Sequence, residues 1–201
     1  MIFEGVYRVA FAGLLFALLV MRVYFMIRVR RSGGRITPDD QAVAREGRIS
    51  VILRAVLFIA LLAFLTMYFL GAAWIDVFRF SLPGWLRWVG FALGVLAVAF
   101  WTWTQIHLDT QWSAQLQLKE KHHMVTTGPY TYIRHPLYLA MMIWGAAAAL
   151  LTANWIFTAV TVLSIAGVVW RTPKEEQMMI ETFGDVYRTY MQRTGRFFPK
   201  I

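Results

Sequence analysis

The sequence predicts an all-α polytopic membrane protein that crosses the bilayer five times. Of the 201 residues, 59% are hydrophobic and 15% are charged, whereas a soluble domain carries about 25% charged residues. The apolar residues come in long blocks, and the mean hydropathy is +0.54. The basic residues stand at the ends of these blocks, which is the pattern of the positive-inside rule.

Five apolar segments predict the membrane helices. The first three have about the 20 residues that a bilayer crossing requires, and the last two are shorter. The turn at 152–154 joins the last two into a tight helical hairpin, in which the small-residue run 145–149 permits close helix contact. In chain order, the segments are residues 6–27, 49–70, 85–106, 137–151 and 155–170.

The connections between these segments differ in charge. Basic residues concentrate in 28–48, 119–134 and 171–200, while the opposite connections offer little beyond Arg79 and Arg87. The basic side is expected to be the cytosol, and five crossings place the two chain ends on opposite sides of the membrane.

Composition also limits the class of partner. The net charge of +9 lies at helix ends, which favours anionic lipid headgroups over nucleic acid. The chain has no cysteine, so disulfides, thiolate metal ligands and a cysteine nucleophile are excluded. Its four histidines lack the spacing of a metal site, and we expect no metal.

Residues 128–138, with the sequence GPYTYIRHPLY, organise the C-terminal half. Pro136 suits the first turn of a helix, and it disfavours helical backbone at His135. The stretch therefore predicts an extended segment that turns at the membrane surface into the fourth membrane helix. We expect the first-turn N–H groups of that helix to face Tyr130, Arg134 and His135, and such a terminus attracts carboxylates and phosphates.

After the fifth apolar segment, the sequence predicts a separate amphipathic helix. Thr172, Pro173 and Glu175 fit a capping box with proline in the first turn, and Gly184 is a weak point within the helix. Glu175 has a second interpretation. It follows Arg171 by four residues, so both lie on one helix face, beside the motif.

The motif at 128–138, followed by Glu175-Glu176 and by an FGxxYxxY pattern at 183–190, resembles the isoprenylcysteine carboxyl methyltransferase family. The resemblance covers roughly residues 112–199 and is closest to short prokaryotic members. It implies an integral membrane enzyme that transfers a methyl group from S-adenosylmethionine to a carboxylate. The RHPxY core alone also resembles sterol reductases and phospholipid methyltransferases.

By position, the resemblance implies which residues form the site. Arg171 would hold the acceptor carboxylate, and Glu175 would accept hydrogen bonds from the cofactor's ribose hydroxyls or amino group. Tyr130 and Tyr138 would wall its adenine and sulfonium with ring faces, which attract cations. The implied cofactor contacts are Gln115, His122, His123, Met124, Val125, Tyr130, His135, Pro136, Leu137, Tyr138 and Glu175.

This chemistry suits the residues, because an acceptor carboxylate is ionised at pH 7 and needs no general base. The site must supply alignment, exclusion of water and a cation that holds the carboxylate, and arginine is permanently charged and fork-shaped. We therefore expect residues 1–107 to form three membrane helices with an Arg-rich loop, and residues 108–201 to form a catalytic half with a cytosolic cofactor pocket. The expected substrate is a lipophilic small molecule or a lipidated, prenylcysteine-like carboxylate.

Three alternatives stay open. A phospholipid amine methyltransferase would gain nothing from Arg171, because a cation beside a cationic product is unfavourable. A sterol-type reductase using NADPH would want a basic cluster for the 2′-phosphate, where the Glu175-Glu176 pair fits badly. The third alternative is a membrane protein that keeps the scaffold without catalysis. The natural acceptor and the oligomeric state cannot be read from the sequence.

Overall fold

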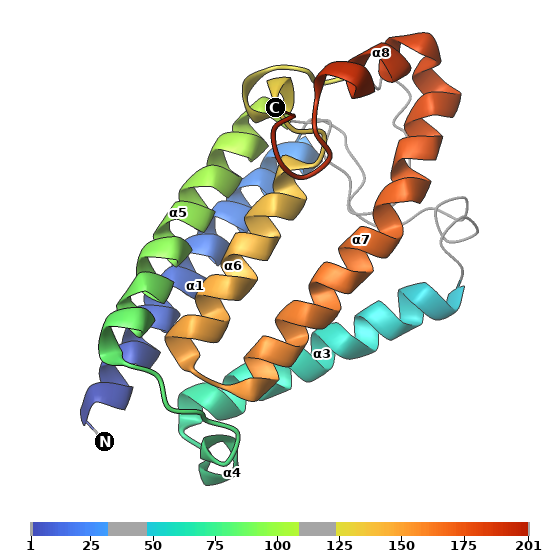
Figure 1. Ribbon diagram of the computed structural model, residues 1–201. Coiled ribbons are helices and arrows are strands. Elements are labelled where there is room, and N and C mark those ends of the chain that lie inside the picture. Colours follow the sequence, from blue (N-terminus) through green and yellow to red (C-terminus); the bar gives the residue numbers. More distant parts are fainter. Residues whose placement is uncertain (1, 32–47, 109–123, 201) are drawn as a thin grey trace.

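The computed structural model describes residues 2–31, 48–108 and 124–200, and in these ranges the regular structure is helical apart from two isolated bridges. Each of the five predicted segments falls within one helix, so the predicted all-α class is confirmed (Figure 1). The helices are α1 (Ile2–Arg31), α3 (Arg48–Leu70), α4 (Ala73–Asp76), α5 (Gly84–Leu108), the 3₁₀ turn η2 (Gly128–Thr131), α6 (Pro136–Thr152), α7 (Trp155–Phe183) and α8 (Asp185–Arg193).

Helices α1, α5 and α6 lie side by side, and α7 and α3 diverge from them (Figure 1). Helix α6 packs most extensively against α5, and α7 packs against α6. We call the end where α6 and α7 join the hairpin end, and the end where α6 begins and α7 stops the site end. The two termini lie at opposite ends of the molecule (Figure 1).

An aromatic core holds four helices together at the hairpin end. The ring of Phe157 on α7 lies 5.3 Å from that of Phe11 on α1 and 5.2 Å from that of Tyr68 on α3. Leu151 of α6 is fully buried in the same cluster. Because edge-to-face rings add to the free energy of apolar burial, this cluster anchors the diverging helices at one end.

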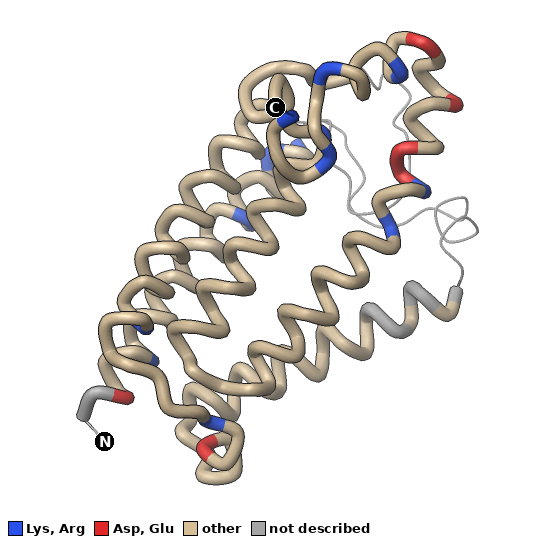
Figure 2. Tube along the Cα trace, viewed as in Figure 1, with Lys and Arg blue, Asp and Glu red and all other residues tan. Residues whose placement is uncertain are grey.

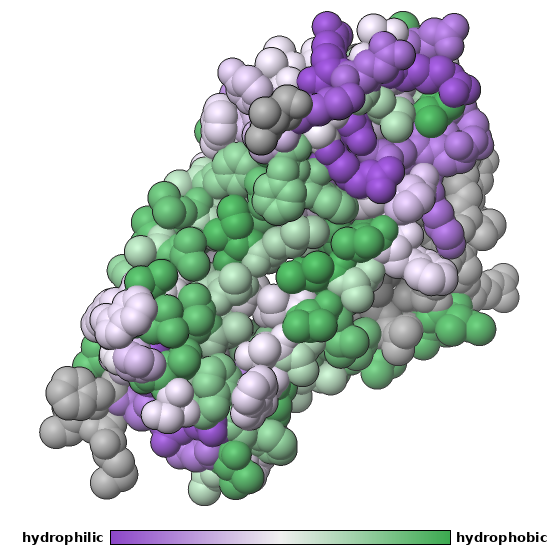
Figure 3. Space-filling view, viewed as in Figure 1, coloured by the Kyte–Doolittle hydropathy of each residue, from purple (hydrophilic) through white to green (hydrophobic). Residues whose placement is uncertain are grey.

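The apolar surface matches a membrane protein. Among the described residues, three helices are long and apolar enough to cross a bilayer: Glu4–Arg31, Gly84–Leu108 and Trp155–Phe183. The shorter apolar helices Ala55–Leu70 and Pro136–Thr152 complete the predicted five. A hydrophobic band covers the middle of the face shown in Figure 3, with polar residues at its two ends.

The predicted start of a separate helix at Thr172 is wrong. Helix α7 continues without a break from Trp155 through Pro173 to Phe183. The Thr172 hydroxyl is buried and donates back to the carbonyl of Val168 at 2.7 Å, so it does not cap a new helix. Such back-bonding competes with capping, and the helix ends instead at Gly184, whose φ of +55° favours glycine.

Arg87, in the first turn of α5, is buried at the hairpin end although the sequence suggested no partner for it. It is 4% exposed, and its Nε and Nη2 donate to the carbonyl of Leu151 at 2.9 and 2.8 Å. Its Nη1 and Nη2 also bond the carboxylate of Glu4, at 2.5 and 3.1 Å. The guanidinium therefore caps the carboxyl end of α6 and ties it to the start of α1.

Close contact between α5 and α6 depends on Gly90. A Cβ there would lie 2.8 Å from both the Leu150 Cβ and the Leu151 backbone nitrogen. We expect Gly90→Ala to push the helices apart and to lower the free energy of unfolding by about 1–3 kcal/mol, as overpacking does. Denaturant unfolding in detergent measures the change in the free energy of unfolding.

Gly13→Ala is the matched control, because a Cβ at this exposed position on α1 meets nothing within 4 Å. This change should be neutral or should add up to about 1 kcal/mol through helix propensity. Equal effects of the two substitutions would contradict the close packing of α5 on α6.

Candidate functional site

The motif lies at the site end, between α5 and α6. Gly128 has φ +58°, and a Cβ on it would lie 2.3 Å from the Cδ2 of His107 at the end of α5. Glycine is therefore required at this position for two reasons: the left-handed backbone and the close approach of the His107 ring. His135 has φ −123° and ψ 59°, outside the helical region as Pro136 predicts. The chain then enters α6 with Pro136 in its first turn.

Glu175 of α7 reaches the motif. Its Oε1 accepts a hydrogen bond from the Tyr138 hydroxyl at 2.6 Å and another from the Arg171 Nε at 2.7 Å. The Nδ1 of His135 lies 3.7 Å from the other carboxylate oxygen. The structure thus brings Arg171 and Glu175 together with His135 and Tyr138, although more than thirty residues separate the two pairs.

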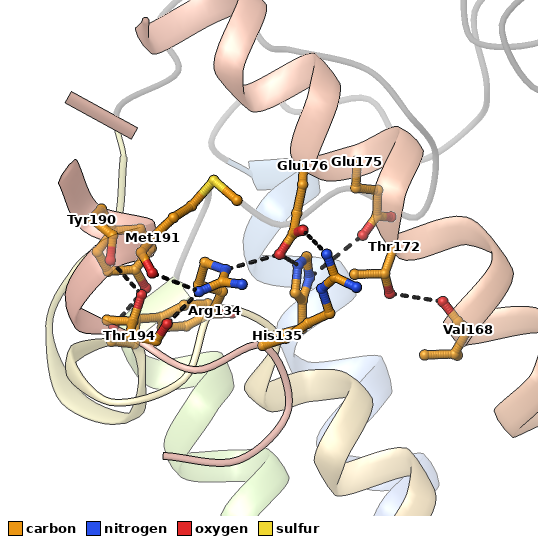
Figure 4. A network of polar contacts seen from close by, with 11 residues as sticks. Arg134, His135, Val168, Thr172, Glu175, Glu176, Tyr190, Met191 and Thr194 are labelled. Atoms are coloured by element: carbon orange, nitrogen blue, oxygen red, sulfur yellow. Dashed lines mark hydrogen bonds and ion pairs between the residues drawn. The ribbon is translucent and has the colours of Figure 1, made fainter. Parts of the chain in front are cut away.

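Glu176 is more deeply buried than Glu175, and its side chain is 4% exposed. It accepts hydrogen bonds from the Arg134 Nε at 2.8 Å and the Arg196 Nη2 at 2.6 Å, and its Oε1 lies 3.3 Å from the His135 Nε2 (Figure 4). A carboxylate only accepts, so this contact places a ring proton on Nε2. The Glu-Glu pair is visible in the sequence, but its pattern predicts no role in the site for Glu176.

Arg134 points into the protein and is not a headgroup anchor at the surface. Its side chain is 9% exposed, and besides Glu176 it bonds the carbonyls of Met191 and Thr194 (Figure 4). These three acceptors come from α7, α8 and the segment after α8. Arg134 therefore joins the motif to the C-terminal part of the chain.

Aromatic side chains surround the same charged groups. The rings of His135 and Tyr138 stack at 5.5 Å with 9° between their planes. Tyr130 is buried, and its carbonyl accepts a hydrogen bond from the Tyr190 hydroxyl at 2.5 Å. Burial raises the pKa of Tyr130 and raises the pKa of Tyr190 to about 12, so both phenols are neutral. Tyr132 is 60% exposed, as expected of an interfacial belt residue.

The N-terminus of α6 offers fewer free donors than the sequence suggested. The N–H groups of Tyr138 and Leu139 both donate to the carbonyl of His135, at 3.1 and 3.2 Å. Pro136 has no N–H group. The N–H groups of Tyr138 and Leu139 are therefore already bonded within the chain.

The remaining predicted residues fall into two groups. Met124 and Val125 are half-buried in the segment before η2, and Pro136 and Leu137 begin α6. Gln115, His122 and His123 lie outside the described residues. The roles of all the predicted site residues stay predictions.

The fold and this site define an integral membrane protein of the all-α class, with carboxylates, arginines and stacked rings gathered at one end of its helices. Residues 88–181 match the sequence model of the isoprenylcysteine carboxyl methyltransferase (ICMT) family. The resemblance indicated by the motif is thereby confirmed over this part of the chain.

Two known relatives are each similar to the chain over less than half of its length. The protein-S-isoprenylcysteine O-methyltransferase of Schizosaccharomyces pombe is 33% identical over 85 residues, which are 40% of this chain and 34% of the relative. Methanethiol S-methyltransferase 1 of Bradyrhizobium diazoefficiens is 39% identical over 72 residues, 35% of this chain and 24% of that protein. The chain thus spans about a third or less of the length of these two relatives.

A solved structure of a eukaryotic intramembrane Ras methyltransferase, ICMT, is similar to this chain. The TM-score is 0.51 at 26% sequence identity, over 58% of this chain and 43% of that one. The similarity of fold thus extends beyond the residues that match the family model.

Proposed function

We propose that the protein is a membrane methyltransferase that uses S-adenosylmethionine to methylate a carboxylate of a lipid-linked or prenylcysteine-like molecule. One observation carries the proposal: Glu175 accepts hydrogen bonds from Tyr138 of the motif and from Arg171 at the same oxygen. An anion, a cation and a stacked aromatic pair thus converge at the site end, and each has a use in this reaction.

The residues present fit the methyl donor. When bound, S-adenosylmethionine would supply a methyl group on a positively charged sulfur, to be taken by a carboxylate oxygen as the carbon–sulfur bond breaks and the neutral thioether leaves. No residue of the site would need to move a proton. Glu175 would accept hydrogen bonds from the ribose hydroxyls or the amino group, and its negative charge complements the cationic donor. The Tyr138 and His135 rings offer flat surfaces to a cation or to adenine, with an attraction of roughly 0.5–2 kcal/mol.

Arg171 would hold the acceptor. A guanidinium carries five N–H donors in a planar fork, and Nε is the one that bonds Glu175. Its geometry allows it to bind two carboxylates at once, with Glu175 on one edge and the acceptor on another. Because the guanidinium stays charged, Arg171 would orient the acceptor through hydrogen bonds without transferring a proton to it.

A carboxylate is a better acceptor than an amine at this site. Methylation of an amine builds positive charge, and Arg171 would oppose that charge. The relatives named above act on prenylcysteine and on methanethiol, so the acceptor class within the similar proteins is not uniform. The site end also carries more Lys and Arg than the hairpin end (Figure 2), which supports a cytosolic active site under the positive-inside rule.

The proposal is tested first by binding. Calorimetric titration of the detergent-solubilised protein with S-adenosylmethionine and with its demethylated product should give saturable binding of both, and NADPH should not bind. Absence of donor binding would favour a non-enzymatic scaffold. Saturable binding of NADPH alone would favour a reductase.

Transfer is tested with labelled S-adenosylmethionine and an S-prenyl cysteine, with phosphatidylethanolamine as the competing acceptor. We expect Arg171→Ala to reduce transfer to the carboxylate by about 100-fold, because a charge-assisted bond to the acceptor is lost, while donor binding changes less than tenfold. Lys174→Ala, three residues away on the same helix, is the control and should keep normal transfer. Unchanged transfer in Arg171→Ala would remove the assigned role.

A further inference from the structure

We propose that Glu176 is a positioning residue. It fastens residues 194–200, which we call the strap, onto the motif and thereby fixes the orientation of His135. The inference rests on the proposed function, because it assigns His135 to the donor site. The two adjacent glutamates of α7 then have different tasks: Glu175 faces the ligand, and Glu176 holds the protein together.

The strap pairs with the motif through the backbone. The N–H of Arg134 donates to the carbonyl of Gly195 at 2.8 Å, and the N–H of His135 donates to the carbonyl of Arg196 at 3.0 Å. In return, the N–H of Gly195 donates to the carbonyl of Tyr132 at 3.1 Å. Ile133 and Gly195 form an isolated parallel bridge. The extended segment that leads into α6 therefore depends on the strap for its backbone partners.

Ionic contacts secure this pairing on both sides. Arg134, from the motif, and Arg196, from the strap, bond the two oxygens of the Glu176 carboxylate at 2.8 and 2.6 Å. Arg134 also bonds the carbonyl of Thr194, the first residue of the strap. One buried carboxylate thus holds both segments, and with His135 as a third partner its acceptor sites face the protein.

The neighbouring glutamate has a different environment. Successive residues on an α-helix point about 100° apart, so Glu175 and Glu176 face different sides, although both lie near the His135 ring. The Glu175 side chain is 18% exposed and lies beside Tyr138 and Arg171, whereas that of Glu176 is 4% exposed. Glu175 is therefore the one that can reach a ligand, and Glu176 is enclosed.

The strap also touches the ring that it would position. Phe197 lies against His135 with ring centroids 6.0 Å apart, and Tyr138 stacks on His135 at 5.5 Å. The contact with Glu176 at Nε2 fixes the rotation of the imidazole between these two rings. Loss of the strap would release the ring contact of Phe197 and the backbone bonds that Arg134 and His135, the two residues before α6, donate to it.

The test compares Arg196→Gln with Arg188→Gln in the full-length protein. Arg196 is 46% exposed, so its replacement spares the core, and Arg188 of the same C-terminal region pairs with the exposed Asp185. We expect Arg196→Gln to raise the KM for S-adenosylmethionine about tenfold, with the acceptor KM changed less than twofold. Arg188→Gln should change neither constant.

Hydrogen exchange supplies a readout that does not depend on activity. The amides of Arg134 and His135 donate to the strap, so their exchange should accelerate at least tenfold in Arg196→Gln and in Glu176→Gln. Gly195→Ala should produce the same effect without altering any charge, because a Cβ there would lie 1.7 Å from the carbonyl oxygen of Phe198.

The outcomes separate the two proposals. Unchanged exchange of these amides in all three variants would overturn the proposal that Glu176 fastens the strap onto the motif. Faster exchange with an unchanged donor KM would overturn the positioning role and leave a structural contact. If the unaltered protein binds no donor, the proposed function fails on its own, and the positioning of a donor site by Glu176 fails with it even where the exchange result supports the strap contacts.

Discussion

Replacing Glu175 with glutamine is expected to weaken the binding of S-adenosylmethionine by about 10- to 100-fold. Glutamine keeps the shape of the side chain but removes the charge, and hydrogen bonds to a charged group contribute roughly 1.5–3 kcal/mol. The change also leaves the Arg171 Nε and the Tyr138 hydroxyl with a weaker acceptor. Calorimetric titration of the solubilised variant measures the loss.

Glu181→Gln is the matched control for this prediction. Glu181 lies on the same helix, is exposed and accepts a hydrogen bond from Gln177 at 3.0 Å. Its replacement should leave donor affinity within twofold of the unaltered protein. If Glu175→Gln bound the donor as tightly as Glu181→Gln does, Glu175 would not be a cofactor contact.

A second large effect is expected at the opposite end of the molecule. Arg87→Gln should lower the free energy of unfolding by about 3–5 kcal/mol, the usual cost of breaking a buried ion pair by removing one partner. Glutamine is too short to reach both Glu4 and the carbonyl of Leu151, so the end of α6 loses its cap. Denaturant unfolding in detergent, followed by tryptophan fluorescence, reports the change.

Arg79→Gln is the control that distinguishes the effect of losing a buried side chain from the effect of losing a charge. Arg79 also pairs with Glu4, at 2.9 Å, but its side chain is 30% exposed. An ion pair of this exposure contributes about 0–1 kcal/mol. The two substitutions remove the same charge near the same carboxylate, so similar losses would show that the cap on α6 contributes little.

Much of the fold was predictable because its signals are local. Long apolar blocks define helices that cross a membrane, and the turn at 152–154 defines the hairpin without knowledge of any partner. Pro136 predicted the start of α6 and the non-helical backbone of His135, since proline acts through its own ring and the preceding residue.

Sequence patterns do not predict structure where a residue's partner is distant or where two partners compete. The capping box at Thr172 is a local pattern, but its hydroxyl bonds Val168 behind it, and α7 continues through Pro173. Arg87 pairs with a glutamate more than eighty residues earlier, and no local spacing reveals that. The acceptors of Arg134 are distant as well, since they lie on α7, on α8 and after it.

The candidate site was predictable only in part. The motif and the arginine–glutamate pair on one helix face named four residues that the structure brings together: His135, Tyr138, Arg171 and Glu175. Glu176 and Arg196 were missed, because the sequence does not reveal that the C-terminal segment returns to the motif. Pairing between extended segments depends on tertiary placement, which neither segment's composition encodes.

Helix α7 is continuous, so the residues that it brings to the motif belong to the same helix as its lipid-facing half. Aromatic rings anchor α7 near its first turn, so a change in the tilt of the helix would displace its site end more than its anchored end. Helices adjust their tilt to bilayer thickness. The geometry of the site is thereby mechanically coupled to the surrounding lipids, and distances within the site would differ between thin and thick bilayers.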